Sequence, residues 1–157
     1  MTMSKIIISA ILLFPILFSQ SVYSKETAVL LPLAGPITPM ENAELTKLAV
    51  EGLSVKFDLK HGEDVDRAVK QAFLEESKKK DCDETNCYRR IAAQYRAEKI
   101  VAIRVVQAGK ESYLVTINLY NVLTNEMTIS QKRECTMCSI EKLKVILKEL
   151  TSNATRE

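Results

Sequence analysis

Runs of apolar and polar residues divide the chain into segments with the periods of strands and helices. The stretch Thr27–Leu33 ("TAVLLPL") is a short, continuous apolar run, which predicts a buried strand. Thr38, Pro39 and Glu41 then supply a cap, a first helical residue and the acid of a capping box. We therefore expect a helix from this point to about Leu53.

The next segment combines one strand with two helices. In residues 54–60 ("SVKFDLK") three apolar residues alternate with polar ones, which predicts a strand with one face in water: Val55, Phe57 and Leu59. Residues 63–80 begin with acids and end with lysines, as the helix dipole favours. A shorter helix should begin near Cys87, so that the two helices form a hairpin whose turn is "DCDETN".

From Lys99 the period changes to that of strands. Residues 99–106 are apolar on both faces, and residues 111–123 alternate, with a hairpin turn at 107–110 between them. Residues 127–134 form a weaker third strand that is polar enough to lie at a sheet edge.

A final helix should be capped by Ser139 and run to Leu150, with its inner face made by Leu143, Ile146, Leu147 and Leu150. The order β-α-β-α-α-β-β-β-α predicts an α+β fold, in which helices pack on a mixed sheet. We expect residues 151–157 to be a frayed tail.

The N-terminus has the pattern of a secretory signal peptide. One cation, Lys5, precedes an apolar run over Ile6–Phe18, and small residues favour cleavage after Ser24. The apolar run is too short for a bilayer, which needs about 20 residues. We therefore predict a signal peptide at 1–24, a single domain at 25–150, export to the periplasm, and no stable membrane insertion after cleavage.

Charge and motifs exclude several function classes. The formal net charge is only +2, with basic and acidic residues interspersed, so a nucleic-acid partner is not expected. We find no glycine-rich phosphate loop, zinc-protease signature or paired acids. His61, followed by Gly62, is best interpreted as a turn residue. The sequence gives weak support for an enzyme, and we predict no catalytic residue, no cofactor and no metal ligand.

The four cysteines carry the candidate chemistry, and they are Cys82, Cys87, Cys135 and Cys138. An even number of cysteines in an exported chain predicts disulfides. We favour local pairing within "CDETNC" and within "CTMC" over crossed pairing, although both patterns remain open. If the first crossover is right-handed, the alternating directions of the elements bring both pairs to one end of the domain.

Two other chemistries fit the same cysteines. Four converging thiolates could hold a structural zinc ion, although the spacing is not that of a zinc ribbon. Alternatively, Cys135 and Cys138 could be a thiol-disulfide redox pair. A nucleophilic cysteine belongs at a helix N-terminus, but here Ser139 takes the cap position. The acids of "DCDETN" loosely suggest a calcium loop and fit helix capping better.

Several segments together resemble a group of exported bacterial envelope domains. They are "AVLLPL", "CDETNC", "AEKIVAIRVV" and "YLVTINLYNVLTNE", which are similar to segments of the TolB N-terminal domain and of the periplasmic part of the curli channel CsgG. The later "CTMC" resembles a cysteine-bearing subset of that group. No β-propeller pattern follows residue 150, and no amphipathic hairpin suits a secretion pore.

The resemblance thus implies a fold and a compartment, and it transfers no functional residue. It implies a non-catalytic periplasmic interaction or scaffolding module of an envelope assembly, with envelope or periplasmic proteins as partners. The alternative is the redox protein that uses Cys135 and Cys138.

Overall fold

A computed structural model describes residues 24–79 and 83–156 of the chain. The predicted signal peptide therefore lies outside the described residues except for Ser24, and Cys82 also lies outside them.

The described residues form the nine elements predicted, in the predicted order. They are β1 (Glu26–Leu30), α1 (Pro39–Leu53), β2 (Phe57–Lys60), α2 (Glu63–Glu76), α3 (Glu84–Tyr95), β3 (Lys99–Gly109), β4 (Ser112–Asn121), β5 (Glu126–Thr136) and α4 (Ile140–Arg156). The α+β class is thereby confirmed. None of the helices in the described ranges is long and apolar enough to cross a membrane.

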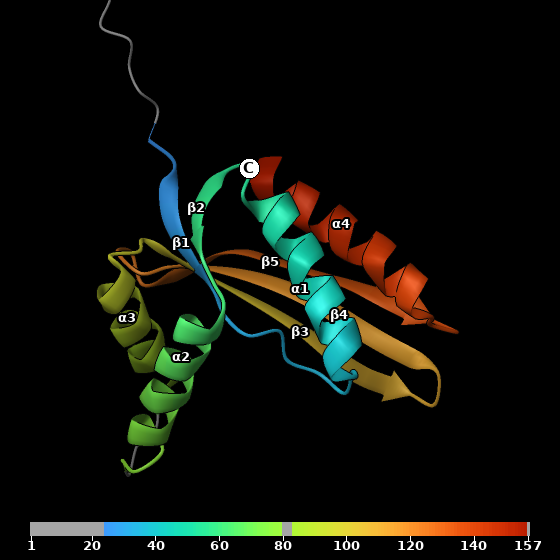
Figure 1. Ribbon diagram of the computed structural model, residues 1–157, viewed down its shortest axis with the longest axis horizontal. Coiled ribbons are helices and arrows are strands. Elements are labelled where there is room, and N and C mark those ends of the chain that lie inside the picture. Colours follow the sequence, from blue (N-terminus) through green and yellow to red (C-terminus); the bar gives the residue numbers. More distant parts are fainter. Residues whose placement is uncertain (1–23, 80–82, 157) are drawn as a thin grey trace, which may run out of the picture.

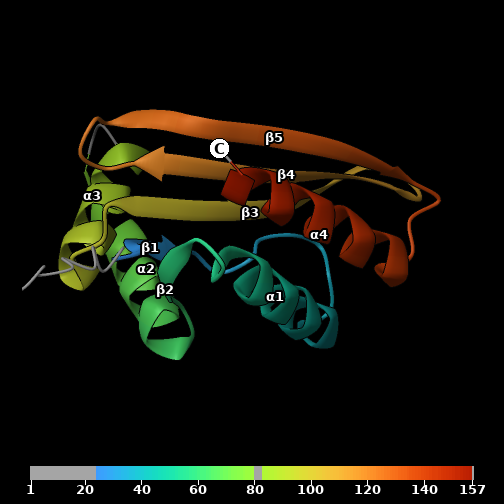
Figure 2. The same ribbon diagram turned by 90° about the horizontal axis from the view of Figure 1, so that it is seen from above.

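The strands make one mixed sheet in the order β2-β1-β3-β4-β5. The first strand pairs in parallel with both β2 and β3, while β3, β4 and β5 form antiparallel pairs. Figure 2 shows β5 as the upper border of this sheet, with α4 lying along the strands.

One face of the sheet is covered by α1 and α4, which lie side by side in Figure 1. Their inner residues pack on alternate residues of the strands; the cluster includes Leu45, Leu53, Leu147, Leu150, Val101, Ile117 and Ile129. The two helices meet closely, because a Cβ at Gly52 would lie 2.5 Å from Thr151 Oγ1. At the start of α1, Thr38 and Glu41 form the predicted capping box.

The α2–α3 hairpin packs on the opposite face, over the end of β1 and the start of β3. Its cluster contains Val29, Val65, Ala72, Tyr88, Ile91, Ile100 and Tyr120. The ring of Tyr88 lies between those of Phe73 and Tyr120, with centroid distances of 6.5 and 5.5 Å. The two helical pairs thus divide the sheet between two separate cores.

Three sequence expectations are corrected. The last helix does not end at Leu150 but continues through Arg156, because Thr151 and Ala154 are buried on its inner side. The third helix begins at Glu84 rather than near Cys87, since the Asp83 carboxylate accepts a hydrogen bond from Thr85 N–H (2.9 Å). Val55, predicted to face inward, precedes β2 and is 72% exposed.

Candidate binding edge at strand β5

The longer of the two sheet edges belongs to β5. This strand has eleven residues and ends the sheet order, with β4 on one side and no further described strand on the other. The sequence predicted an edge strand over residues 127–134, and the structure confirms its place and lengthens it at both ends. A long, open edge presents backbone donors and acceptors that a second chain can pair with.

The direction of each backbone group on β5 follows from the pairing of β3. Leu31 N–H donates to Val101 O (2.9 Å), and Val105 N–H donates to Ala34 O (2.7 Å). The odd-numbered residues of β3 therefore turn their backbone groups toward β1. Because these directions alternate along a strand, the even-numbered residues bond to β4.

The same alternation carries across β4. Arg104 lies opposite Thr116, so the odd-numbered residues of β4 bond to β5, where Val115 lies opposite Arg133. The odd-numbered residues of β5 are then bonded to β4, and four residues turn their N–H and C=O groups outward: Ser130, Lys132, Glu134 and Thr136.

Two of these outward carbonyls already accept a hydrogen bond from a nearby side chain. Lys132 O accepts from Arg133 Nη1 (3.2 Å), and Thr136 O accepts from Lys142 Nζ (3.4 Å). A carbonyl oxygen has two lone pairs, so each can also accept from a partner strand. The four outward groups are therefore able to continue the ladder.

A β-bulge limits the regular part of this edge. Leu119 lies opposite Ile129 and Tyr120 lies opposite Met127, so Thr128 is an extra residue on β5. A bulge twists and interrupts a ladder. The segment 130–136 therefore forms the regular part of the edge, and we call it the β5 edge.

Two hollows lie between β5 and α4, one near each end of the helix. The first, of about 430 Å³, is lined by Glu134, Cys135, Thr136, Glu141, Lys142, Val145 and Ile146. The second, of about 650 Å³, is lined by Ser130, Gln131, Lys132, Arg133, Asn153 and Arg156. Between them Arg133 bonds to Glu149 Oε1, with Nη2 at 2.9 Å, and links the strand to the helix.

Two exposed apolar side chains lie near the end of the β5 edge, and one of them, Val145, lines the first hollow. Val145 is 67% exposed on α4, and Met137, directly after β5, is 73% exposed. Apolar surface beside outward backbone groups is the combination that an added peptide strand uses.

The cysteines of "CTMC" form a disulfide at the end of the same edge. The bond joins Cys135, which is buried in the core of the α1–α4 face, to Cys138 in the turn before α4. Ser139 caps the helix as predicted, since its carbonyl accepts from Leu143 N–H (3.0 Å) and its Oγ accepts from Lys142 N–H. Cys135 and Cys138 thus both precede the cap. Cys135 is buried and Cys138 is half-buried, and a disulfide in this position, outside the helix, suits a structural role better than a nucleophilic one.

The other cysteine site is on the opposite face of the sheet. Cys87 is buried on α3, where its Sγ lies 3.7 Å from the carbonyl oxygen of Ala72. The prediction that both cysteine pairs converge at one end is therefore wrong. It needed β3 and β5 to run opposite to β1, but β1 and β3 are parallel and the two antiparallel pairings give β5 the same direction, which places Cys135 at the other end of the sheet. This removes the basis of the four-thiolate zinc interpretation. Pairing between Cys82 and Cys87 stays a prediction, since Cys82 lies outside the described residues.

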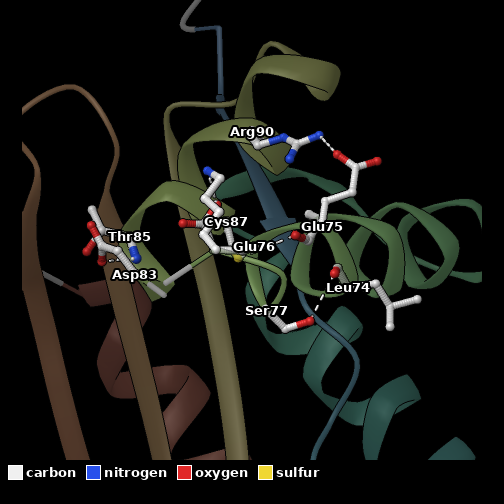
Figure 3. A network of polar contacts seen from close by, with 10 residues as sticks. Leu74, Glu75, Glu76, Ser77, Asp83, Thr85, Cys87 and Arg90 are labelled. Atoms are coloured by element: carbon white, nitrogen blue, oxygen red, sulfur yellow. Dashed lines mark hydrogen bonds and ion pairs between the residues drawn. The ribbon is translucent and has the colours of Figure 1, made fainter. Parts of the chain in front are cut away.

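A buried carboxylate joins α2 to α3 beside Cys87 (Figure 3). Glu76 is fully buried, and its Oε2 accepts from Lys79 Nζ. The hydrogen bond from Lys79 holds the pKa of Glu76 below its usual value, with further help from the Asp83 backbone and the Asn86 side chain. Asp83, in the acidic turn, caps α3 as predicted. Sequence periodicity placed Glu76 on a helix but gave no sign that it would be buried.

A second ion pair ties the same hairpin together. Arg90 on α3 bonds to Glu75 on α2 and lowers the pKa of that carboxyl. Within residues 24–79 and 83–156, no three His, Cys, Asp or Glu side chains are grouped so that they could hold a metal ion. His61 is exposed in the turn that leads into α2, as predicted.

Comparison with known proteins places the fold among bacterial proteins. No protein-family model matches the chain, and no curated protein matches it by sequence. The LpoB C-terminal domain from Escherichia coli is similar in structure, with a TM-score of 0.50 and 17% identity over 76% of this chain and 89% of that one. The NMR structure of E. coli LpoB matches with a TM-score of 0.50 and 14% identity, over 72% of this chain and 57% of that one.

TolB from Acinetobacter baumannii also matches, with a TM-score of 0.51 and 10% identity. The match covers 83% of this chain and 28% of TolB, so the shared fold is a part of that larger protein. At these identities the similarity establishes the fold alone. The chain has a fold that LpoB and TolB also contain, while the likeness to CsgG and to the N-terminal domain of TolB in particular remains a sequence-based expectation.

Proposed function

We propose that this chain is a non-catalytic, exported module of a bacterial cell envelope that binds protein partners along the β5 edge. The observation that carries the proposal is the edge itself: a regular strand segment with outward backbone groups, bordered by two hollows and an exposed apolar end. An extended segment of a partner would add to the sheet as a sixth strand. Its backbone would supply affinity, and its side chains would enter the hollows beside α4.

The cellular setting rests on independent support. The sequence predicts a signal peptide and resembles exported envelope domains, and the fold is shared with LpoB and TolB. We therefore assign the module to the periplasm, where a disulfide such as Cys135–Cys138 persists. Its partners would be periplasmic or envelope proteins.

Affinity capture from periplasmic extract tests the proposal with one pair of variants. Lys132→Pro removes an outward N–H and leaves the bonds to β4 in place, so it blocks strand addition. Lys132→Ala removes the same side chain but keeps the N–H, and serves as the matched control. We expect the wild type to capture its partners, Lys132→Ala to capture the same partners with no more than the weakening that loss of the side chain causes, and Lys132→Pro to lose them.

Retention of every partner by folded Lys132→Pro would show that the β5 edge is not the binding surface. Insulin reduction coupled to Cys135 and Cys138 would contradict the non-catalytic assignment and support the redox alternative.

A further inference from the structure

We infer that the β5 edge takes the β5 strand of a second copy of this chain, with a two-fold axis at Arg133. The inference rests on the proposed function, because it names a partner for the same edge. Antiparallel pairing of the two strands would join the sheets of both copies into one continuous sheet.

The backbone of the β5 edge allows this register. An axis at residue 133 places Lys132 of one copy opposite Glu134 of the other, and Ser130 opposite Thr136. All four residues turn their N–H and C=O groups outward, so each opposing pair can exchange both hydrogen bonds of an antiparallel ladder. The bulge at Thr128 lies beyond the paired segment and does not interrupt it.

In this register, the side chains of the β5 edge in one copy are complementary to those of the β5 edge in the other copy. Lys132 and Glu134 are both exposed on the sheet face opposite α4, and neither forms an ion pair within the described part of the chain. Across the axis they would form two equivalent Lys–Glu pairs. Ser130 and Thr136 would form hydroxyl pairs on the same face, and both kinds of cross-strand pair stabilise antiparallel strands.

Neighbouring registers do not have this complementarity. An axis at Lys132 would place that lysine opposite its own copy, and an axis at Glu134 would do the same for the glutamate. Like charges directly opposite each other destabilise a strand pair. The charges of "KRE" therefore select the axis at the central arginine.

On the other face, the axis brings two copies of Arg133 together. Each guanidinium is already bonded to Glu149 of its own α4, through Nε at 3.1 Å and Nη2 at 2.9 Å. The cluster at the axis thus contains two positive and two negative groups, with no net charge. This ion pair also holds each α4 in place beside the joined strands.

Sedimentation velocity over a range of concentrations tests the inference with charge variants. We expect the mature wild type to dimerise, and Lys132→Glu or Glu134→Lys to dimerise roughly tenfold more weakly, because each puts like charges opposite each other twice. The double variant Lys132→Glu with Glu134→Lys exchanges the two charges and should restore the wild-type affinity. Lys70→Glu, on the exposed face of α2, changes the net charge equally and should leave the dimer unaffected.

Two results would overturn the inference: a wild type that stays monomeric at every concentration, or a double variant that dimerises no better than the single variants. Circular dichroism confirms that each variant is folded.

The capture experiment distinguishes failure of this inference from failure of the proposed function. If the chain is monomeric but Lys132→Pro still loses captured partners, the β5 edge binds another protein, and the inference that it binds a second copy of this chain is wrong. If Lys132→Pro and wild type capture the same partners, the proposed function is wrong.

Discussion

The two edges of the sheet differ in length, direction and surroundings. The β2 edge has four residues, pairs in parallel with β1, and is followed closely by Gly62 and α2. The β5 edge belongs to an eleven-residue antiparallel strand bordered by hollows along α4. Short edge strands are a common protection against unwanted pairing. The β2 edge therefore offers a partner strand fewer backbone groups than the β5 edge does.

Proline substitutions at neighbouring residues of β5 should give the largest difference in the free energy of unfolding, because neighbouring residues turn their N–H groups to opposite sides of the strand. Gln131 lies opposite Ile117 and turns its N–H toward β4, whereas Lys132 turns its N–H outward. Gln131→Pro should lower the free energy of unfolding by about 3 kcal/mol, because it removes a ladder bond and leaves the Ile117 carbonyl without a donor. Lys132→Pro should change it by less than about 1 kcal/mol. Urea denaturation of both variants measures the difference, and equal losses would contradict the assigned directions.

The β5 edge also ends in a covalent link, whereas β2 ends in a turn without one. Replacing Cys135 and Cys138 together with Ser should lower the free energy of unfolding by about 2 kcal/mol, because the open chain gains entropy in the unfolded state. Thermal unfolding with and without reductant measures this. We expect the folded variant to keep partner binding; its loss would make the disulfide part of the binding surface.

A smaller change in stability is expected at the glycine that follows β2. Gly62 has a φ of 95°, and no atom lies within 4 Å of the point that a Cβ would occupy, so an added methyl group would meet backbone strain rather than a clash. Gly62→Ala should cost about 1 kcal/mol of stability. Gly109→Ala is the control, because its Cβ would meet Ser112 at an ordinary 3.6 Å. Equal stability of the two variants would contradict the expected backbone strain at Gly62.

The smallest expected change in stability concerns the α2–α3 hairpin that follows β2, and it depends on pH. Because the pKa of Glu76 is lowered in the folded protein, its ionised form stabilises the fold above its unfolded pKa of about 4.3. This stability is lost as the pH falls through the lower, folded pKa. Glu76→Gln should therefore be less stable than wild type at pH 7, and the gap should narrow in acid. Urea denaturation of wild type and Glu76→Gln over a pH series measures this, and a gap that stays the same in acid would contradict the role of the ionised carboxylate.

The sequence was most informative where local signals decide structure. Thr38 with Glu41, and Ser139, have cap patterns that the structure confirms, and the order of all nine elements follows from periodicity. These features depend on residues a few positions apart, so one sequence is enough to identify them.

Tertiary contacts explain what was missed. α4 continues past Leu150 because Thr151 packs against Gly52 of α1, a contact between residues far apart in the chain. The burial of Glu76 depends on the hairpin in the same way. The polarity of residues 127–134 predicted an edge strand, yet the outward direction of Lys132 required the register of three neighbouring strands.

Amide hydrogen exchange by NMR follows the backbone groups of both edges in one experiment. The mature protein would be studied from low to high concentration, and then with captured partner. We predict that the amides of Ser130, Lys132, Glu134 and Thr136 exchange rapidly in dilute protein and become protected on association, while those of β2 do not change. Protection that appears along β2, or at neither edge when a complex forms, would contradict the assignment of β5 as the binding edge.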